Sequence, residues 1–311
     1  MKQIGEATTP LEEALEAAVA KAAMFRGKSL RYAPVHGGIS NSNFRIQLDS
    51  NPLEYFVKIP GIGTEMFIDR RAAFDASRKA AAAGLGPRVY EDLYDDGIEI
   101  HDFIQDRRAC TNGDLAREDT RLAAIGAYRK MHAIEPLTLE KSVFDMIDEH
   151  ADQVSELKGW LPPDYAWLNH QYILARSALE ASGMDLVPCF NDPMPGNFMI
   201  GNDGSIMLID YEYASMNDRC YDLGIWFGEM FFTPDQEVEL IEAYFAEVRP
   251  EIVSRVTVHK ALADVKWALW SFVQQQVSAL DFDYFKYGQW KLMRLRSIMH
   301  SPDWAIHLSR V

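Results

Sequence analysis

The chain has 311 residues, of which 48% are hydrophobic and 25% are charged, and it carries a formal net charge of −15 at pH 7. This length and apolar content predict an ordered globular protein with room for two domains. The acidic excess argues against nucleic acid and anionic membranes as partners, and it favours a cationic or metal-bound ligand. No apolar run approaches the ~20 residues of a membrane-spanning helix, so we expect no membrane insertion.

Cysteine and histidine usage excludes two further classes of protein. The three cysteines occur in no CxxC pair, which argues against a disulfide scaffold and predicts a cytoplasmic protein. The eight histidines are scattered without zinc-ligand spacing, so no zinc site is expected. Residues 1–25 mix charged side chains into an alanine-rich helical pattern, unlike a signal peptide. No sequence feature sets the oligomeric state.

The first third of the chain predicts two helices and a five-stranded sheet. The expected helices are Pro10–Phe25 and Asp69–Gly84, and the expected strands are Leu30–His36, Asn43–Leu48, Glu54–Ile59, Pro87–Leu93 and Ile98–Ile104. The second helix ends at Gly84, because glycine readily adopts a left-handed conformation and the following Gly86-Pro87 pair bars continuation. The pair Gly37-Gly38 between the first two strands usually indicates only a hairpin. Residues 1–104 are the expected N-terminal domain.

The remainder, residues 105–311, is the expected C-terminal domain and is mainly helical. Its predicted helices are Leu115–His132, Val143–Lys158, Tyr165–Ser182, Leu223–Phe231, Asp235–Val248 and a long C-terminal pair. A segment of strand-like character interrupts them. It contains Asp192-Pro-Met-Pro-Gly-Asn197, an apolar run at Phe198–Ile200, the turn Gly201-Asn-Asp-Gly204 and a second apolar run that ends in Asp210.

This interrupting segment predicts a metal site. Asn-Asp-Gly between two apolar runs favours a β-hairpin, because these residues tolerate positive φ. Such a hairpin places Asp192 and Asn197 at the same end as Asp210. Carboxylate and amide oxygens are the ligands that Mg²⁺ prefers, with water and phosphates completing its shell.

The spacing Asp-x₄-Asn, followed by strand, turn, strand and Asp, is typical of kinase-type phosphoryl transfer. In that interpretation Asp192 accepts the proton of the substrate hydroxyl. Asn197 holds a metal ion, and Asp210 bridges metal and phosphates. The Asp-x₄-Asn spacing alone is common by chance, so the interpretation depends on the hairpin and its terminal carboxylate.

A longer part of the sequence resembles the choline/ethanolamine kinase family, which belongs with the aminoglycoside-phosphotransferase-like kinases. The resemblance lies in Asn191-Asp192, Asn197-Phe198, Leu208-Ile-Asp-Tyr-Glu-Tyr-Ala214 and Asn217-Asp-Arg-Cys-Tyr-Asp-Leu-Gly224. It extends from about Gly37 to about Met293. It implies a two-lobed, protein-kinase-like α+β fold with a small N-terminal antiparallel-sheet lobe, which binds nucleotide, and a larger, mainly helical C-terminal lobe.

The resemblance also implies the nucleotide-binding residues. The residues Ser40, Asn41, Ser42 and Asn43 correspond to the family's phosphate loop, and Lys58 corresponds to the strand lysine that contacts ATP phosphates. Without the family motif, Lys58 is more simply a solvated edge lysine. Glu212 is expected to reach a second Mg²⁺ ion or its water shell, and Asp222 to support the catalytic loop.

Two positions depart from the family pattern. Ala73 stands where the helix normally supplies a glutamate to pair with the strand lysine. Asp69 and Asp75 are candidate substitutes, but neither occupies the aligned position, so the sequence leaves the partner of Lys58 open. Phe190 stands where related kinases have a histidine two residues before the catalytic aspartate. That histidine packs and hydrogen-bonds without carrying a proton, so an aromatic ring is a tolerable replacement.

The substrate is predicted from aromatic residues near the C-terminus. Trp267 and Trp270 lie on one helix face, and aromatic residues at this spacing usually form a core. By resemblance, however, Tyr213, Trp267, Trp270, Phe282 and Tyr287 match the cage that holds the quaternary ammonium group in choline kinases. Ring faces attract such a cation without hydrogen bonds.

The sequence thus predicts phosphorylation of a small amino alcohol, most simply choline, with ATP and Mg²⁺. One alternative is another kinase of the superfamily that acts on ethanolamine, an aminoglycoside or thiamine. The other is a catalytically weak nucleotide- or amine-binding protein, an alternative that Ala73 and Phe190 leave open.

Overall fold

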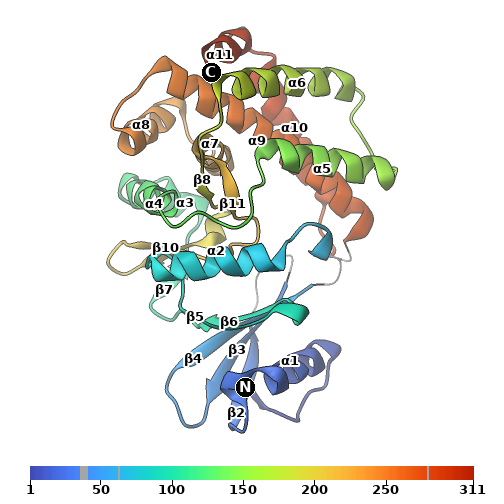
Figure 1. Ribbon diagram of the computed structural model, residues 1–311, viewed down its shortest axis with the longest axis vertical. Coiled ribbons are helices and arrows are strands. Elements are labelled where there is room, and N and C mark those ends of the chain that lie inside the picture. The colour runs from blue at the N-terminus through green and yellow to red at the C-terminus, as the bar shows by residue number, and fades with distance from the viewer. Residues whose placement is uncertain (36–40, 62–63, 279) are drawn as a thin grey trace. The chain divides into compact units, whose positions relative to one another are not determined.

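The computed structural model describes residues 1–311 except 36–40, 62–63 and 279 (Figure 1). Its internal contacts divide the chain into two compact units. The first unit is Met1–Arg108 with Met199–Tyr213, and the second is Ala109–Phe198 with Ala214–Val311. The N-terminal region is built on an antiparallel sheet and the C-terminal region on helices, which confirms the predicted α+β class.

The first unit is built on a six-stranded antiparallel sheet in the order β1-β2-β3-β4-β6-β5. Its strands are β1 (Lys2–Gln3), β2 (Leu30–Val35), β3 (Asn41–Leu48), β4 (Glu54–Pro60), β5 (Val89–Leu93) and β6 (Ile98–Asp102). Its helices are α1 (Pro10–Lys21) and α2 (Arg70–Ala82). Alternate residues of β3 and β4, such as Ile46 and Val57, are buried in one apolar core with Leu15 of α1. This alternation is what a half-buried antiparallel sheet requires.

Polar side chains begin both helices of this unit. Thr9 caps α1 in a capping box with Glu12. Asp69 caps α2 by accepting hydrogen bonds from the backbone N–H groups of Arg71 and Ala72, at 3.0 and 3.1 Å. Such caps satisfy backbone donors that have no partner inside the helix. The helix expected over Pro10–Phe25 is shorter, because α1 ends at Lys21 and a 3₁₀ turn follows.

The predicted hairpin forms as expected. Strands β9 (Phe198–Gly201) and β10 (Ile206–Leu208) join β7 (Arg107–Ala109) in a three-stranded sheet, in the order β10-β9-β7. In the turn, Gly204 N donates to Gly201 O at 3.0 Å, with Gly204 at φ +78°. Glycine adopts that φ without steric penalty.

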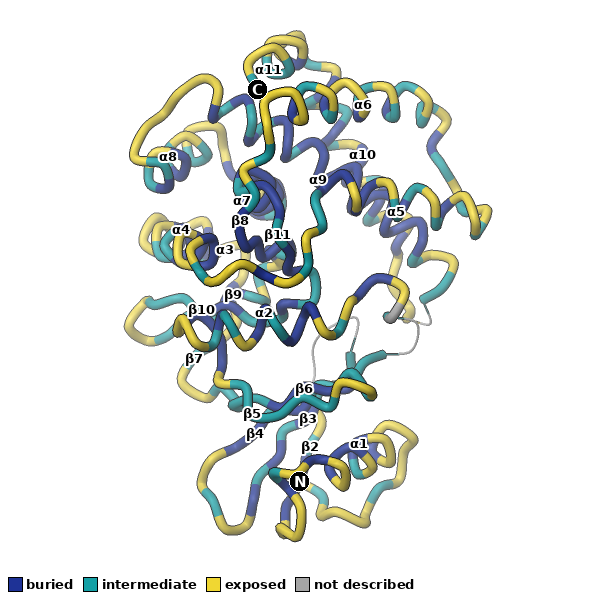
Figure 2. Tube along the Cα trace, in the orientation of Figure 1, coloured by how far each residue is buried: buried dark blue, intermediate teal, exposed yellow. Residues whose placement is uncertain are grey.

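The second unit is mainly helical. Its helices are α3 (Asn112–Leu115), α4 (Glu118–Met131), α5 (Val143–Glu156), α6 (Tyr165–Ser182), α7 (Arg219–Met230), α8 (Pro234–Phe245), α9 (Pro250–Val277), α10 (Tyr284–Met299) and α11 (Trp304–Arg310). The long helix α9 packs against α5, α7, α10 and α11 and is largely buried (Figure 2). The helix expected over Leu115–His132 is two helices, because Arg117 adopts an extended conformation between them.

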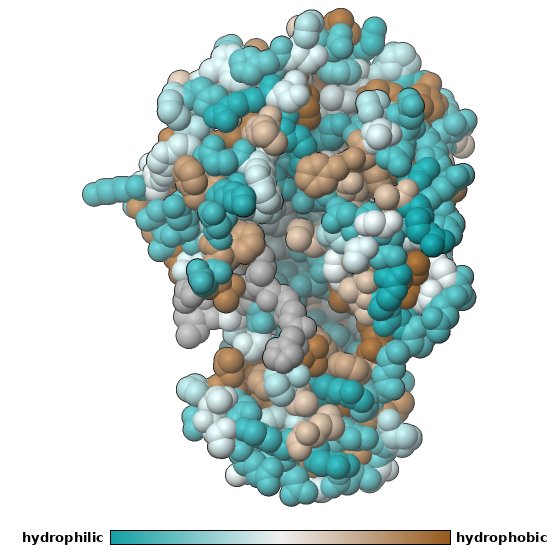
Figure 3. All heavy atoms as spheres, turned by 180° about the vertical axis from the view of Figure 1, so that it is seen from behind, coloured by the Kyte–Doolittle hydropathy of each residue, from teal (hydrophilic) through white to brown (hydrophobic). Residues whose placement is uncertain are grey.

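A two-stranded antiparallel sheet of β8 (Leu186–Cys189) and β11 (Ser215–Asp218) also lies in the second unit. The three cysteines of the chain are buried. Hydrophilic residues dominate the face of the molecule shown in Figure 3, with hydrophobic residues scattered among them. Among the residues that the structure describes, no helix combines the length and apolar character needed to cross a membrane.

Candidate active site

Charged side chains of the first unit gather around the carboxylate that follows β10. Lys58 Nζ lies 2.6 Å from Asp210 Oδ1 and 2.9 Å from Glu212 Oε1. Arg70 forms a second ion pair with Glu212, and Asn41 Nδ2 donates to the same carboxylate at 3.0 Å. One network therefore joins β3, β4, α2 and the segment after β10.

Local backbone contacts hold this segment in place. Leu208 N donates to Leu85 O at 2.7 Å, which ties the end of β10 to the turn after α2. The Tyr211 ring packs on Gly86, where a Cβ atom would lie 3.1 Å from the tyrosine oxygen. Asp210 itself has φ +70°, a left-handed conformation that aspartate tolerates better than most residues. These features direct the chain so that Asp210 and Glu212 both meet Lys58.

The charges of this network shift one another's pKa. Burial lowers the pKa of Lys58, but the charges of Asp210 and Glu212 outweigh burial and raise it above its usual value. Burial raises the pKa of Glu212, and Lys58 and Arg70 reverse that effect and hold it below its usual range. Loss of water contact raises the pKa of Asp210, because Lys58 offsets only part of that effect. Lys58 is therefore held as a cation between two acids that differ in acidity.

The structure identifies the partners of Lys58, which the sequence left open. Asp69 and Asp75 were candidates, because Ala73 replaces the usual glutamate. Asp69 instead caps α2, and Asp75 pairs with Lys79 one turn further along the same helix, at 2.8 Å. In the described part of the chain, the carboxylates within salt-bridge distance of Lys58 are those of Asp210 and Glu212.

Lys58 also lies in a row of polar residues across the sheet. It is paired in register with Asn43 of β3 and with Glu99 of β6, so the three side chains share one face of the sheet. Glu99 is buried, and burial raises its pKa to about 7 despite a hydrogen bond from Ser77 and the charge of Lys58. Burial also lowers the pKa of His101 to about 4. Glu99 was not predictable from the sequence, since a lone glutamate in a strand gives no local signal.

The predicted catalytic loop lies in the second unit. Asn197 Nδ2 donates to the side-chain and backbone oxygens of Asp192, both at 3.1 Å. The preceding residue, Asn191, is buried with φ +62°, and its side chain donates to Ser215 Oγ at 2.8 Å. Asn217 Nδ2 in turn donates to Asn191 Oδ1 at 3.2 Å. Two residues of β11 thus fix the backbone from which Asp192 projects.

Asp222 of α7 supports the same loop, as its sequence context suggested. It accepts hydrogen bonds from the backbone N–H groups of Phe190, at 2.6 Å, and Asn191, at 2.7 Å. His132 Nε2 lies 3.0 Å from Asp222, and His132 Nδ1 lies 2.6 Å from the hydroxyl of Tyr244. A buried chain of polar groups therefore connects α8 and the end of α4 to the catalytic loop.

The ring of Phe190 is fully buried and contacts Phe198 edge to face, with ring centroids 6.2 Å apart.

His132, Cys189 and Asp222 place ligand-type atoms within 4.8 Å of one another. The Asp222 carboxylate already accepts backbone hydrogen bonds, and Cys189 Sγ lies 3.3 Å from Asn217 O. These contacts support a structural role for the trio.

Four of the five predicted cage residues form a continuous chain of ring contacts in the second unit. The centroids of Trp267 and Trp270 are 5.1 Å apart, those of Trp270 and Tyr287 are 6.1 Å apart, and those of Tyr287 and Phe282 are 6.2 Å apart. Both tryptophans are buried, whereas the Phe282 side chain is 44% exposed. The fifth residue, Tyr213, is the last residue of the first unit. We call the four contacting rings the aromatic cluster.

Of the predicted phosphate loop, Ser40 lies outside the described residues, while Asn41, Ser42 and Asn43 begin β3. Arg70 also belongs to the charged network, although no sequence motif indicated it. It follows Asp69 in the sequence, and only the tertiary structure brings it to Glu212.

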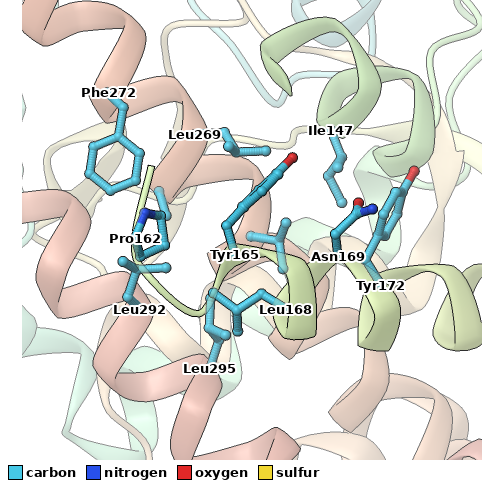
Figure 4. Close-up of a pocket in the computed structure, with 12 residues that line it drawn as sticks. Ile147, Pro162, Tyr165, Leu168, Asn169, Tyr172, Leu269, Phe272, Leu292 and Leu295 are labelled. Atoms are coloured by element: carbon cyan, nitrogen blue, oxygen red, sulfur yellow. The ribbon is translucent and has the colours of Figure 1, made fainter. Parts of the chain in front are cut away.

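An apolar cavity lies among α5, α6, α9 and α10 (Figure 4). Aliphatic and phenylalanine side chains form most of its wall, and Tyr165, Asn169 and Tyr172 add polar atoms. Of the predicted site residues that the structure describes, none lines this cavity.

Comparison with known proteins agrees with this geometry. Residues 32–295 match the choline/ethanolamine kinase family model. The chain is 26% identical over 317 residues to the human choline/ethanolamine kinase, covering 84% of this chain and 78% of the human protein. A solved choline/ethanolamine kinase family protein from Mesorhizobium loti is similar with a TM-score of 0.82 and 28% identity, over 96% of this chain and 98% of its own.

The choline kinase LicA from Streptococcus pneumoniae has the same fold, with a TM-score of 0.77 and 23% identity over 93% of this chain and 100% of its own. These likenesses confirm the predicted protein-kinase-like fold class and the family resemblance. The chain therefore belongs to the choline/ethanolamine kinase family, as a small-molecule kinase that phosphorylates the hydroxyl of an amino alcohol.

Proposed function

We propose that the amino alcohol is choline, with ATP as phosphoryl donor and Mg²⁺ as the metal ion. The observation that carries this choice is the aromatic cluster on α9, α10 and the loop between them, in the same unit as Asp192. A trimethylammonium group has no N–H to donate, so it binds ring faces more readily than a primary ammonium, which needs acceptors. Tyr213, three residues after Asp210, is the fifth ring of the proposed cage.

Asp192 is the proposed base. Its carboxylate orients the substrate hydroxyl and accepts the proton as the oxygen attacks phosphorus. Asn197 supports this role because its amide N–H group already donates to Asp192, while its amide oxygen is a suitable Mg²⁺ ligand. The backbone hydrogen bonds to Asp222 keep the loop rigid. Catalysis in this scheme depends mainly on positioning and charge neutralisation.

The nucleotide-binding groups are Lys58 and the polar residues Ser40, Asn41, Ser42 and Asn43. When bound, Mg²⁺ neutralises charge on the phosphates during transfer. The residues present fit this ion: the Asp210 side chain is 34% exposed, whereas those of Lys58 and Glu212 are 13% and 6% exposed. Asp210 is therefore the accessible oxygen donor of the network, and Glu212 is the proposed contact to a second Mg²⁺ or its water shell.

The substrate is tested with a methylation series. Ethanolamine, N-methylethanolamine, N,N-dimethylethanolamine and choline are each assayed for ADP release with ATP and Mg²⁺. We expect kcat/KM to increase along the series and to be highest for choline. A maximum at ethanolamine would reassign the substrate within the same family. Failure of all four amines, with the fold intact, would support a catalytically weak binding protein.

The cage is tested separately with Trp270→Ala. We expect KM for choline to rise by roughly tenfold or more, the equivalent of ~1.4 kcal/mol of cation–ring contact, with a smaller change in kcat. The matched control is Trp290→Ala, because Trp290 is 56% exposed on α10 and outside the aromatic cluster. Equal KM values for the two variants would remove the support for choline.

A further inference from the structure

The helix that carries both cage tryptophans also carries a buried lysine. Lys266 precedes Trp267 on α9, and only 1% of its surface is exposed. Its Nζ atom lies 3.1 Å from the centroid of the Trp267 ring, well within the range of a cation–π contact. An ammonium group of the protein therefore covers a face of a ring that the proposed cage would use.

A second internal cation contacts another ring of the aromatic cluster. Lys291 Nζ is 4.8 Å from the centroid of the Tyr287 ring and forms an ion pair with Glu229. Glu229 balances the charge of Lys291 directly. The charge of Lys266 interacts instead with the Asp192 carboxylate, which favours the protonated lysine.

Several other groups influence Lys266. From the segment before α5 and from α5 itself these are Lys141, Glu149 and His150, and from α10 it is Lys291. Burial lowers the pKa of His150 to about 3, so this histidine stays neutral above pH 5. Burial lowers the pKa of Lys266 well below its usual value, and the Asp192 charge opposes that effect only in part. Burial thus moves the loss of the Lys266 proton to lower pH than for a lysine in water.

Two cations cannot share one dry ring face, because their mutual repulsion is strong where water is excluded. We propose that Lys266 is a specificity-determining residue whose ammonium group competes with the substrate's quaternary ammonium group for the aromatic cluster. Binding of choline therefore requires Lys266 to be neutral, and its proton passes to the solvent. This inference rests on the choline site proposed above.

Choline is a suitable probe because its charge does not change with pH. Its dissociation constant is measured by titration calorimetry from pH 5.5 to 8.5. For the wild-type protein we expect affinity to increase with pH, by up to about tenfold per unit where Lys266 titrates, because the protonated lysine must release one proton. Measurements in two buffers of different ionisation enthalpy count that proton directly.

In Lys266→Met, an apolar side chain of similar length removes the competing charge. This variant should lose the pH dependence and the proton release, and one pH unit below the wild-type transition it should bind choline about tenfold more tightly. The matched control is Lys286→Met, because the Lys286 ammonium lies 5.1 Å from the Trp290 centroid but is solvent-exposed. It should leave the wild-type profile unchanged.

Tetramethylammonium separates this inference from the proposed function, because it has the cation but no hydroxyl. If it binds with the Lys266-dependent profile while choline is not phosphorylated, the inference holds and the choline kinase assignment fails. If choline is phosphorylated but wild-type binding is independent of pH and releases no proton, the competition does not occur and the inference is overturned.

Discussion

At the scale of single residues, the catalytic assignments depend on two aspartates in different settings. Asp192 is held by an amide donor, whereas Asp210 is held by a lysine. We expect Asp192→Asn and Asp210→Asn each to lower kcat by at least ~10²-fold, because each removes a charge that positioning alone cannot replace. Steady-state kinetics and circular dichroism check the activity and the fold.

The control for this pair is Asp203→Asn in the exposed turn of the same hairpin, where Asp203 accepts a hydrogen bond from Ser205. It should retain activity. Near-normal turnover of either test variant, with an intact fold, would disprove the role assigned to that aspartate.

Glu99 gives a prediction about pH. Its folded-state pKa of about 7 lies above the usual value of 4.5 because the carboxylate is buried. The neutral form therefore favours the folded state below about pH 4.5, and that contribution is lost as pH rises toward 7. Across this interval we expect the free energy of unfolding of the wild type to fall by roughly 1–3 kcal/mol relative to Glu99→Gln.

Urea denaturation at pH 5 and pH 8 measures this difference. Glu13→Gln, at an exposed position of α1, is the control and should track the wild type. If Glu99→Gln shows the wild-type pH dependence, Glu99 is ionised at both pH values and the proposed linkage is absent.

At the scale of elements, local signals predicted most helices and the catalytic hairpin. Tyr165–Ser182 was predicted with its observed bounds, and the turn at Gly201–Gly204 follows directly from its residues. Pairings between distant segments were not predictable in this way. The strands β8 and β11 are too short to show a hydrophobic pattern of their own. They pair across the intervening loop and hairpin, so the sequence next to each strand does not indicate its partner.

The ion pair of Lys58 shows the same limit at the site. The family pattern suggested a partner for Lys58 on α2, whereas the observed partner Asp210 lies 152 residues after Lys58 in the sequence. The motif identified both charged residues, but a motif does not state which charges meet. Lys266 was similarly hidden, because its burial depends on α5 and α10 packing around α9.

Packing of α7 on α9 depends on a glycine. A Cβ atom at Gly224 would lie 2.7 Å from Lys260 N and 2.8 Å from Val256 O, which are backbone atoms that cannot rotate away. We expect Gly224→Ala to destabilise the protein by roughly 1–3 kcal/mol, because the two helices must separate. Thermal or urea denaturation measures the loss.

The comparison variant is Gly126→Ala in α4, where a Cβ atom has no heavy atom within 4 Å. It should be neutral or stabilising by up to ~1 kcal/mol, because alanine favours the helix. A similar effect of the two substitutions would show that helix propensity, rather than the close approach of α7 and α9, determines the result.

At the scale of the whole molecule, nucleotide and metal should stabilise the folded chain together. At a concentration 100 times its dissociation constant, ADP with Mg²⁺ should add about 2.7 kcal/mol to the free energy of unfolding. For a chain of this size that corresponds to a rise of ~5 °C in Tm. Differential scanning fluorimetry with ADP, with and without EDTA, isolates the part that depends on Mg²⁺.

In Asp210→Asn we expect the EDTA-sensitive part of this stabilisation to disappear, because the accessible metal ligand is lost. The variant Asp203→Asn should keep it. An undiminished metal effect in Asp210→Asn would place the Mg²⁺ ligands elsewhere.

The two segments of the first unit are synthesised at different times. It is completed by Met199–Tyr213, long after Arg108 has been made. Until residue 212 leaves the ribosome, Lys58 and Arg70 lack the carboxylates that later neutralise them. At translation speeds of about 5–20 residues per second, the nascent N-terminal sheet waits roughly 5–20 s for its last segment. The ion pairs of Lys58 with Asp210 and Glu212 can therefore form only after the predicted catalytic loop has been synthesised.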